Sequence, residues 1–241
     1  PLPICPAFPD VATVMQDPDS LSKILADKRV IGALAQVDKL LANASAQLPS
    51  GLVATIVLDQ TTIWSNGYGF RDIRNPKSGP PRSTDLVRIA SISKVFTTLL
   101  LYVLRDEGLL ESVDENVQHY LPEFSIQSSG WNTSEVITLH SLAAQLSGLP
   151  RETPYPCAAF STPYDPNHCN ESTVLKLLAA KAAVLPPNTR FHYSNLGMAV
   201  LGRALGHVAT KSTTWDPLSY EKAIGDYIFD PLGMVSPTQV H

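Results

Sequence analysis

Ser91 and Lys94 are the residues whose types and spacing point most directly to chemistry in this sequence. If the apolar run that follows them, residues 95–104, is helical, the two side chains lie one turn apart on the same face. A serine hydroxyl is a weak nucleophile until a neighbouring group takes its proton, and a lysine in its neutral form can take it. The same spacing also arises by chance at the solvated start of a helix, so the pair alone leaves both interpretations open.

The flanking residues predict a helix that begins close to this pair. Asp85 precedes it, and the segment Arg105-Asp106-Glu107-Gly108 follows it with a helix-stop pattern. At a helix start, free N–H groups and the positive end of the dipole favour developing negative charge. We therefore expect Ser91 at or near a helix N-terminus, with only the helix beyond Lys94 in the core.

Hydrophobic patterns elsewhere predict the elements that must position this helix. The β-branched run at residues 52–58 and the segment at 61–70 predict an antiparallel hairpin, preceded by a helix through residue 46. Further helices are predicted at residues 113–121, 172–184, 196–208 and 220–229, and residues 136–146 are expected to begin extended and to continue as a helix.

These elements predict an α/β fold with two lobes and a site in the cleft between them. An antiparallel sheet flanked by helices takes residues 20–111 and 221–241, an all-helical lobe takes residues 112–220, and residues 1–19 form an extended arm.

Composition excludes some classes of partner. The 241 residues carry a net charge of −4 and no basic tract, which argues against nucleic acid. The longest apolar run is too short to span a bilayer, so no membrane span is expected. The six histidines show no metal-site spacing, and neither a metal ion nor a cofactor is expected.

Cysteines and glycosylation sequons favour a secreted glycoprotein. The Asn-x-Ser/Thr sequons at Asn43, Asn132 and Asn170 exceed the roughly one or two expected by chance. A disulfide between Cys157 and Cys169 would close a Pro-rich loop, with a contribution of about 3 kcal/mol. Cys5 is left over, and it is free, pairs with another chain, or pairs with sequence that is missing here. The opening Pro1 is typical of a mature end left after processing or of an artificial boundary.

Three segments carry a family resemblance when they are taken in order. They are residues 89–97 with Ser-x-x-Lys, residues 142–150 with the ending Ser-Gly-Leu-Pro, and residues 193–197 with Tyr-x-Asn. Together they resemble the serine β-lactamase and penicillin-binding-protein superfamily, in particular its branch of class C β-lactamases, esterases and D-aminopeptidases. The resemblance covers roughly residues 25–241 and implies a β-lactamase/transpeptidase-like fold.

The resemblance also implies roles for individual residues. Ser91 would be the acylated nucleophile, with its N–H in the oxyanion hole, and Lys94 its proton partner. Tyr193 would act as general base and then as acid to the leaving group, provided that a nearby ammonium favours its phenolate. Asn195 would orient Lys94 or hold a substrate amide. The alternative for Tyr193 is a structural role, as a loop aromatic packed on Pro187. The substrate that the resemblance implies is an ester or amide of a small molecule or peptide.

The sequence departs from this family in three places. Relatives carry a Lys-Thr-Gly or His-x-Gly triad after the tyrosine, whereas Lys77-Ser78-Gly79 precedes Ser91 and is interpreted as coincidence. Relatives also run on well beyond this length, so a C-terminal remainder or a second chain is expected to complete the sheet. Ala144-Gln145 stands where relatives often have Thr-His. The alternative function is therefore a non-catalytic β-lactamase-like binding or scaffold protein that lacks the third motif.

Overall fold

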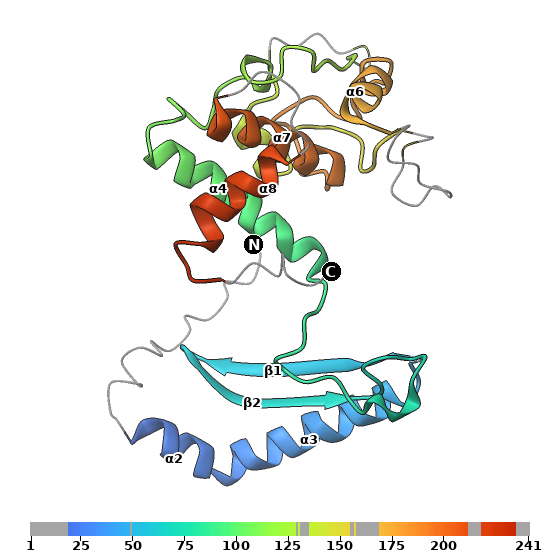
Figure 1. Ribbon diagram of the computed structural model, residues 1–241, viewed down its shortest axis with the longest axis vertical. Coiled ribbons are helices and arrows are strands. Elements are labelled where there is room, and N and C mark those ends of the chain that lie inside the picture. Colours follow the sequence, from blue (N-terminus) through green and yellow to red (C-terminus); the bar gives the residue numbers. More distant parts are fainter. Residues whose placement is uncertain are drawn as a thin grey trace, which may run out of the picture. The chain divides into compact units, whose positions relative to one another are not determined.

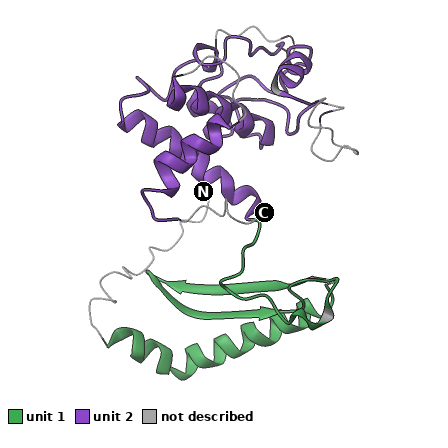
Figure 2. Ribbon diagram, viewed as in Figure 1, with its two compact units in different colours: residues 1–88 green, residues 89–241 purple. Residues whose placement is uncertain are grey.

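The computed structural model describes residues 19–48, 50–128, 130, 135–154, 157, 169–211 and 218–234 (Figure 1). Contacts divide the chain into two compact units, residues 1–88 and residues 89–241 (Figure 2). Of the predicted arm, only Asp19 lies within the described residues. The lobe boundaries expected from the sequence stay a prediction.

The first unit is a hairpin with helices beside it. Helices α2 (Ser20–Ala26) and α3 (Lys28–Ser45) precede strands β1 (Leu52–Leu58) and β2 (Thr61–Tyr68), and a short 3₁₀ turn, Pro76–Ser78, follows. The strands pair antiparallel from Leu52↔Tyr68 to Leu58↔Thr61, with one irregularity after Ile56. The predicted hairpin is confirmed, and the fold is the expected mixture of helices and a small antiparallel sheet.

Polar side chains join α3 to β2 in this unit. The Asp38 carboxylate accepts hydrogen bonds from the Tyr68 hydroxyl at 2.6 Å and from the Asn66 amide at 2.7 Å. These two bonds lower the pKa of Asp38, that of Tyr68 having the larger effect. The strand also needs Gly67, because a Cβ there would lie 1.8 Å from the backbone oxygen of Pro81.

The second unit is helical and has α7 (Asn195–Thr210) at its centre. Helix α7 contacts α4 (Ser93–Asp106), α5 (Leu139–Ala143) and α8 (Ser219–Ile224), and α6 (Glu171–Ala179) belongs to the same unit (Figure 1). Short 3₁₀ turns occur at Ala90–Ile92 and Val117–His119, and a π-helical turn, Gly225–Phe229, continues α8. None of the helices in the described ranges is long and apolar enough to cross a membrane.

The hydrophobic core of this unit lies on and around α7. Its fully buried aliphatic side chains come from α4, from α5 and from α7 itself: Leu100, Leu101, Leu104, Leu139, Leu142, Leu201, Ala204 and Leu205. Helix α8 approaches α7 closely at Gly206, where a Cβ would lie 2.6 Å from the Ser219 hydroxyl. The packing therefore fixes the helix whose first turn follows Tyr193.

Three predicted helices are shorter in the structure than their patterns suggested. The segment at residues 172–184 is helical only as far as Ala179. The segment at residues 113–121 contains only the turn Val117–His119, which Asn116 caps by accepting the Gln118 N–H. In the segment at 136–146, which begins extended as expected, the helix stops at Ala143, because Gln145 adopts a φ of +62° that ends it.

Candidate active site

Ser91 lies in the turn that leads into α4. The 3₁₀ turn Ala90–Ile92 passes directly into the helix, and Lys94 is its second residue. The Ser91 side chain is exposed and Lys94 is half-buried. Ala90, just before the serine, has a φ of +46°, in the left-handed region that side chains rarely adopt.

The structure brings Ser91, Lys94 and Tyr193 together, although Tyr193 is 102 residues away from the serine. The Ser91 Oγ and the Tyr193 hydroxyl are 2.6 Å apart, and either can donate the hydrogen bond. The Lys94 Nζ donates to the Ser91 Oγ at 3.1 Å and lies 4.8 Å from the centre of the Tyr193 ring. The serine oxygen thus contacts a phenol and an ammonium.

This arrangement makes the Tyr193 phenolate easier to form. Its hydrogen bond with Lys94 is the largest cause that lowers the pKa of Tyr193, followed by its bond with Ser91. Burial opposes this change, while the charges of Lys94 and Arg151 reinforce it. A half-buried tyrosine with a lowered pKa beside a serine has the property that a general base needs.

The residue after Tyr193 fastens it to the segment that follows α5. Ser194 is fully buried, and its N–H donates to the side-chain oxygen of Gln145 at 2.5 Å. Its hydroxyl donates to the Pro150 carbonyl at 2.7 Å and accepts the Gly197 N–H at 2.7 Å as the N-cap of α7. Gln145, a departure from the usual family pattern, therefore supports the backbone behind the site.

Asn195 makes its side-chain contact with a residue that the sequence did not single out. Its amide nitrogen donates to the Glu152 carboxylate at 2.7 Å, and the same carboxylate oxygen pairs with the Arg151 Nε at 3.2 Å. The Arg151 guanidinium lies 5.0 Å from the centre of the Tyr193 ring. The role of Asn195 toward Lys94 or a substrate amide stays a prediction. Charged residues after the Ser-Gly-Leu-Pro segment were the available signal for Arg151 and Glu152.

A cavity of about 380 Å³ borders Lys94 between α4, α7 and α8. Thr97, Gly202 and Tyr220 form part of its wall. Neither Ser91 nor Tyr193 is among its described lining residues, so the cavity is not assigned to substrate.

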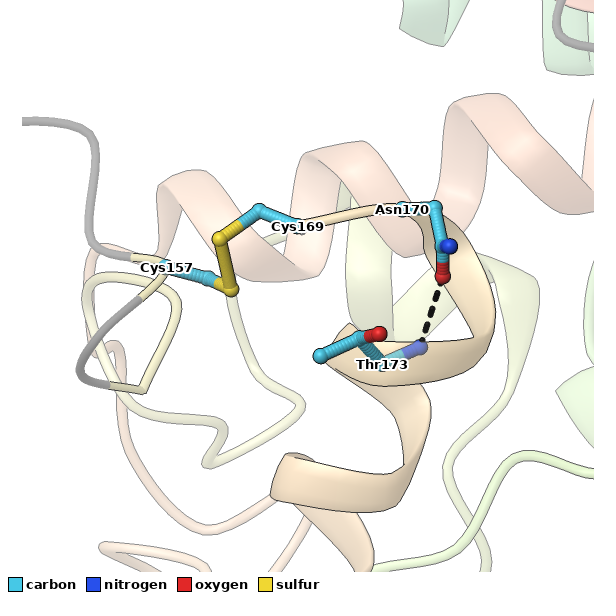
Figure 3. The surroundings of a disulfide bond; sticks show 4 residues. All are labelled: Cys157, Cys169, Asn170 and Thr173. Atoms are coloured by element: carbon cyan, nitrogen blue, oxygen red, sulfur yellow. Dashed lines mark hydrogen bonds between the residues drawn. A yellow bond between two sulfur atoms is a disulfide. The ribbon is translucent and has the colours of Figure 1, made fainter. Parts of the chain in front are cut away.

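The predicted disulfide lies next to one of the three predicted sequons. The sulfur atoms of Cys157 and Cys169 are at bonding distance, 2.11 Å (Figure 3). Asn170 is exposed and caps α6, with its side-chain oxygen accepting the Thr173 N–H at 3.0 Å (Figure 3). Asn43 is exposed on α3, whereas Asn132 and Cys5 fall outside the described residues.

The third motif expected of the family was not found after Tyr193 in the sequence. Its look-alike, Lys77-Ser78-Gly79, lies at the 3₁₀ turn Pro76–Ser78 in the first unit. There the Ser78 hydroxyl accepts the Asp72 N–H at 3.0 Å. This contact gives the segment a local structural role.

The helical unit, the hairpin and the Ser-Lys-Tyr cluster fit the β-lactamase/transpeptidase-like fold that the sequence resemblance implies. The Beta-lactamase family pattern matches residues 37–238, and the chain belongs to this family.

Individual proteins of known sequence or structure are also similar to this chain. "Beta-lactamase-like protein 2" of Dictyostelium discoideum is 33% identical over 233 residues, which cover 96% of this chain and 39% of that protein. Among solved structures, the octameric penicillin-binding protein homologue from Pyrococcus abyssi is 25% identical, with a TM-score of 0.64 over 85% of this chain and 43% of that one. The β-lactamase/D-alanine carboxypeptidase from Yersinia pestis is 28% identical, with a TM-score of 0.55 over 77% of this chain and 48% of that one. The chain therefore spans about two fifths to one half of the length of these relatives.

Proposed function

We propose that this protein is a serine hydrolase or acyltransferase that works through an acyl-Ser91 intermediate. One observation carries the proposal: the Ser91 Oγ lies 2.6 Å from the Tyr193 hydroxyl and 3.1 Å from the Lys94 Nζ. A nucleophile within hydrogen-bond reach of a base, with a cation beside that base, is the arrangement that acyl transfer requires. The proposed substrate is an ester or amide of a small molecule or peptide.

The chemistry follows from these contacts of the Ser91 Oγ. The Ser91 Oγ bonds to the acyl carbon as its proton passes to the Tyr193 phenolate, which Lys94 stabilises. Tyr193 then returns that proton to the departing alcohol or amine as its bond to the acyl carbon breaks. Water, or a second alcohol, repeats these steps in the reverse direction, releases an acid or a new ester, and restores Ser91.

Covalent labelling with a fluorophosphonate tests this function. The probe should add once, at Ser91, as seen by intact mass and peptide mapping, and Ser91→Ala should abolish the addition. Ser93→Ala is the matched control, because Ser93 is also exposed and lies two residues away. A folded protein that takes up no probe, or that is labelled equally after Ser91→Ala, would overturn the proposal and favour the binding or scaffold alternative.

We also propose that the protein is secreted and glycosylated. The support is the pairing of Cys157 with Cys169 next to the exposed sequon at Asn170. Helix capping uses only the side-chain oxygen of Asn170, so the amide nitrogen to which a glycan attaches is left for modification. Material from a secretory host should lose mass with an N-glycosidase, and Asn170→Asp, which keeps a capping oxygen, should remove that site's share. Glycosylation at Asn170 would be contradicted if N-glycosidase left the mass of the wild-type protein unchanged and Asn170→Asp had no effect on the mass lost.

A further inference from the structure

The Tyr193 ring has two cations beside it, and the proposed function has so far used only one. The Lys94 Nζ lies 4.8 Å from the ring centre and is also bonded to the Ser91 Oγ. The Arg151 guanidinium carbon lies 5.0 Å from the same centre. Both distances fall within the range in which a cation is attracted to an aromatic ring.

Arg151 is anchored by its backbone as well as by its side chain. Its carbonyl oxygen accepts the N–H groups of Asn195 at 2.8 Å and Leu196 at 3.3 Å, in the first turn of α7. Its Nε pairs with Glu152, whose carboxylate also accepts the Asn195 amide at 2.7 Å. The arginine therefore contacts the chain directly after Tyr193 at several points, and its guanidinium is oriented by a neighbour.

We propose that Arg151 is a positioning residue for Tyr193: its carbonyl holds the first turn of α7 while its guanidinium lies over the phenol ring that faces Ser91. The placement of Arg151 can be tested without any reaction. Its effect on rate rests on the function proposed above.

The placement has an electrostatic consequence. The charged and titratable groups around Tyr193 are Lys94 from α4, Arg151 and Glu152 from the segment after α5, and His192 beside it in the chain. A cation near the ring favours the electron-rich phenolate over the neutral phenol. Removing the charge of Arg151 should therefore raise the pKa of Tyr193, because the ring would lose one of its two nearby cations. The Glu152 carboxylate would also remain without its paired cation.

The direct test is an NMR titration of the protein carrying ¹³C at tyrosine Cζ, with the Tyr193 signal assigned from Tyr193→Phe. Arg151→Gln should move the Tyr193 midpoint to higher pH, and Arg151→Lys, which keeps a charge, should restore part of the change. Arg105→Gln is the matched control: Arg105 lies 4.9 Å from the Tyr102 ring and pairs with the adjacent Asp106, yet belongs to α4 away from Tyr193. It should leave the Tyr193 midpoint unchanged.

Two results would overturn the inference. One is an unchanged Tyr193 midpoint in Arg151→Gln. The other is a loss of amide protection throughout α7, which Arg151→Lys fails to restore, since that pattern shows a general loosening of the fold rather than an effect of charge on Tyr193.

Labelling rates separate this inference from the proposed function. If Ser91 is acylated, Arg151→Gln should slow labelling at neutral pH by roughly tenfold, short of the 10²- to 10⁴-fold expected for loss of the base itself, and shift the rate profile to higher pH. If the wild-type protein is not labelled but its Tyr193 midpoint still depends on Arg151, the function fails and the positioning role stands. If the wild-type protein is labelled but its Tyr193 midpoint does not depend on Arg151, the proposed function stands and the positioning role fails.

Discussion

Tyr193 gains its chemical character from three neighbours that reach it from separate parts of the chain. Lys94 and Ser91 contact its hydroxyl side, and Arg151 lies near its ring. Its side chain is only half-buried, so these contacts outweigh burial, and the net change in its pKa is downward. A tyrosine in this setting can exchange a proton with Ser91 below the pH at which an ordinary tyrosine ionises.

Tyr193→Phe tests that character at the residue scale. Loss of the hydroxyl should slow fluorophosphonate labelling of Ser91 by about 10²- to 10⁴-fold, the usual contribution of a general base. In the wild-type protein the rate should rise with pH through the lowered pKa of Tyr193, because the phenolate is the active form, and this rise should be absent from the variant. Tyr102→Phe is the control, and equal pH profiles for wild type and Tyr193→Phe would contradict the assignment.

The sequence predicted part of this arrangement at the residue scale. Ser91, Lys94 and Tyr193 stood out because each lies in a short recognisable pattern, and the structure brings all three together. Arg151 and Glu152 did not stand out, since a charged pair in a loop is ordinary until the fold places it against another segment. Gln145 was noticed only as a departure, and its bond to the Ser194 N–H needed the folded backbone.

At the element scale, the start of α7 depends on the buried cap Ser194. Ser194→Ala should lower the free energy of unfolding by about 1–2 kcal/mol, because it removes the cap and leaves the Pro150 carbonyl without its hydroxyl donor. Urea denaturation measures this loss. Thr189→Ala is the control, since the exposed Thr189 hydroxyl also donates to a proline carbonyl at 2.7 Å. An equal, small effect of both changes would contradict the role of the cap.

Helices α4 and α8 are joined by a hydrogen bond between Thr97 and Tyr220, whose oxygens are 2.6 Å apart. Tyr220→Phe should cost about 1 kcal/mol near neutral pH. Burial raises the pKa of Tyr220, so the stabilisation by its neutral hydroxyl is fully present below the ordinary tyrosine pKa and is lost as the pH rises through the raised value. Urea unfolding at increasing pH should show the advantage of the wild type disappearing, whereas a constant difference would contradict this account.

Helix and strand boundaries show what sequence patterns could and could not predict at this scale. The strand at residues 52–58 was predicted to the residue, because a β-branched apolar run bounded by turn residues has few alternatives. The helix expected to run through residue 146 ends three residues early, because Gln145 takes a left-handed φ while its side chain bonds to Ser194. That conformation depends on a partner 49 residues away, which no local pattern reports.

On the scale of the whole molecule, the hydrophobic core is unevenly distributed. The core cluster takes its members from residues 100–228, all in the second unit. In the described part of the first unit, Tyr68 and Pro81 are the buried apolar side chains. A two-stranded hairpin with so little burial is marginally stable by its own contacts, whereas the second unit buries many aliphatic side chains around α7.

Hydrogen exchange should reveal this difference. Amides in β1 and β2 should exchange through openings of lower free energy than amides in the middle of α7, because local stability follows buried apolar contact. Mass spectrometry of peptides from residues 52–68 and 198–208 measures both in one sample. Equal protection of the two segments would show that the hairpin has stabilising contacts beyond those of its own unit.

The left-handed backbone conformation of Ala90 has a consequence for directed evolution of this protein. An alanine in the left-handed region costs roughly 1–2 kcal/mol, which glycine would avoid. A library selected only for survival of heating should therefore enrich glycine at position 90, directly before the proposed nucleophile Ser91. Such variants would be more stable, yet the backbone that presents Ser91 would have more conformational freedom. Ranking variants by melting temperature alone would therefore not report any loss in the positioning of Ser91.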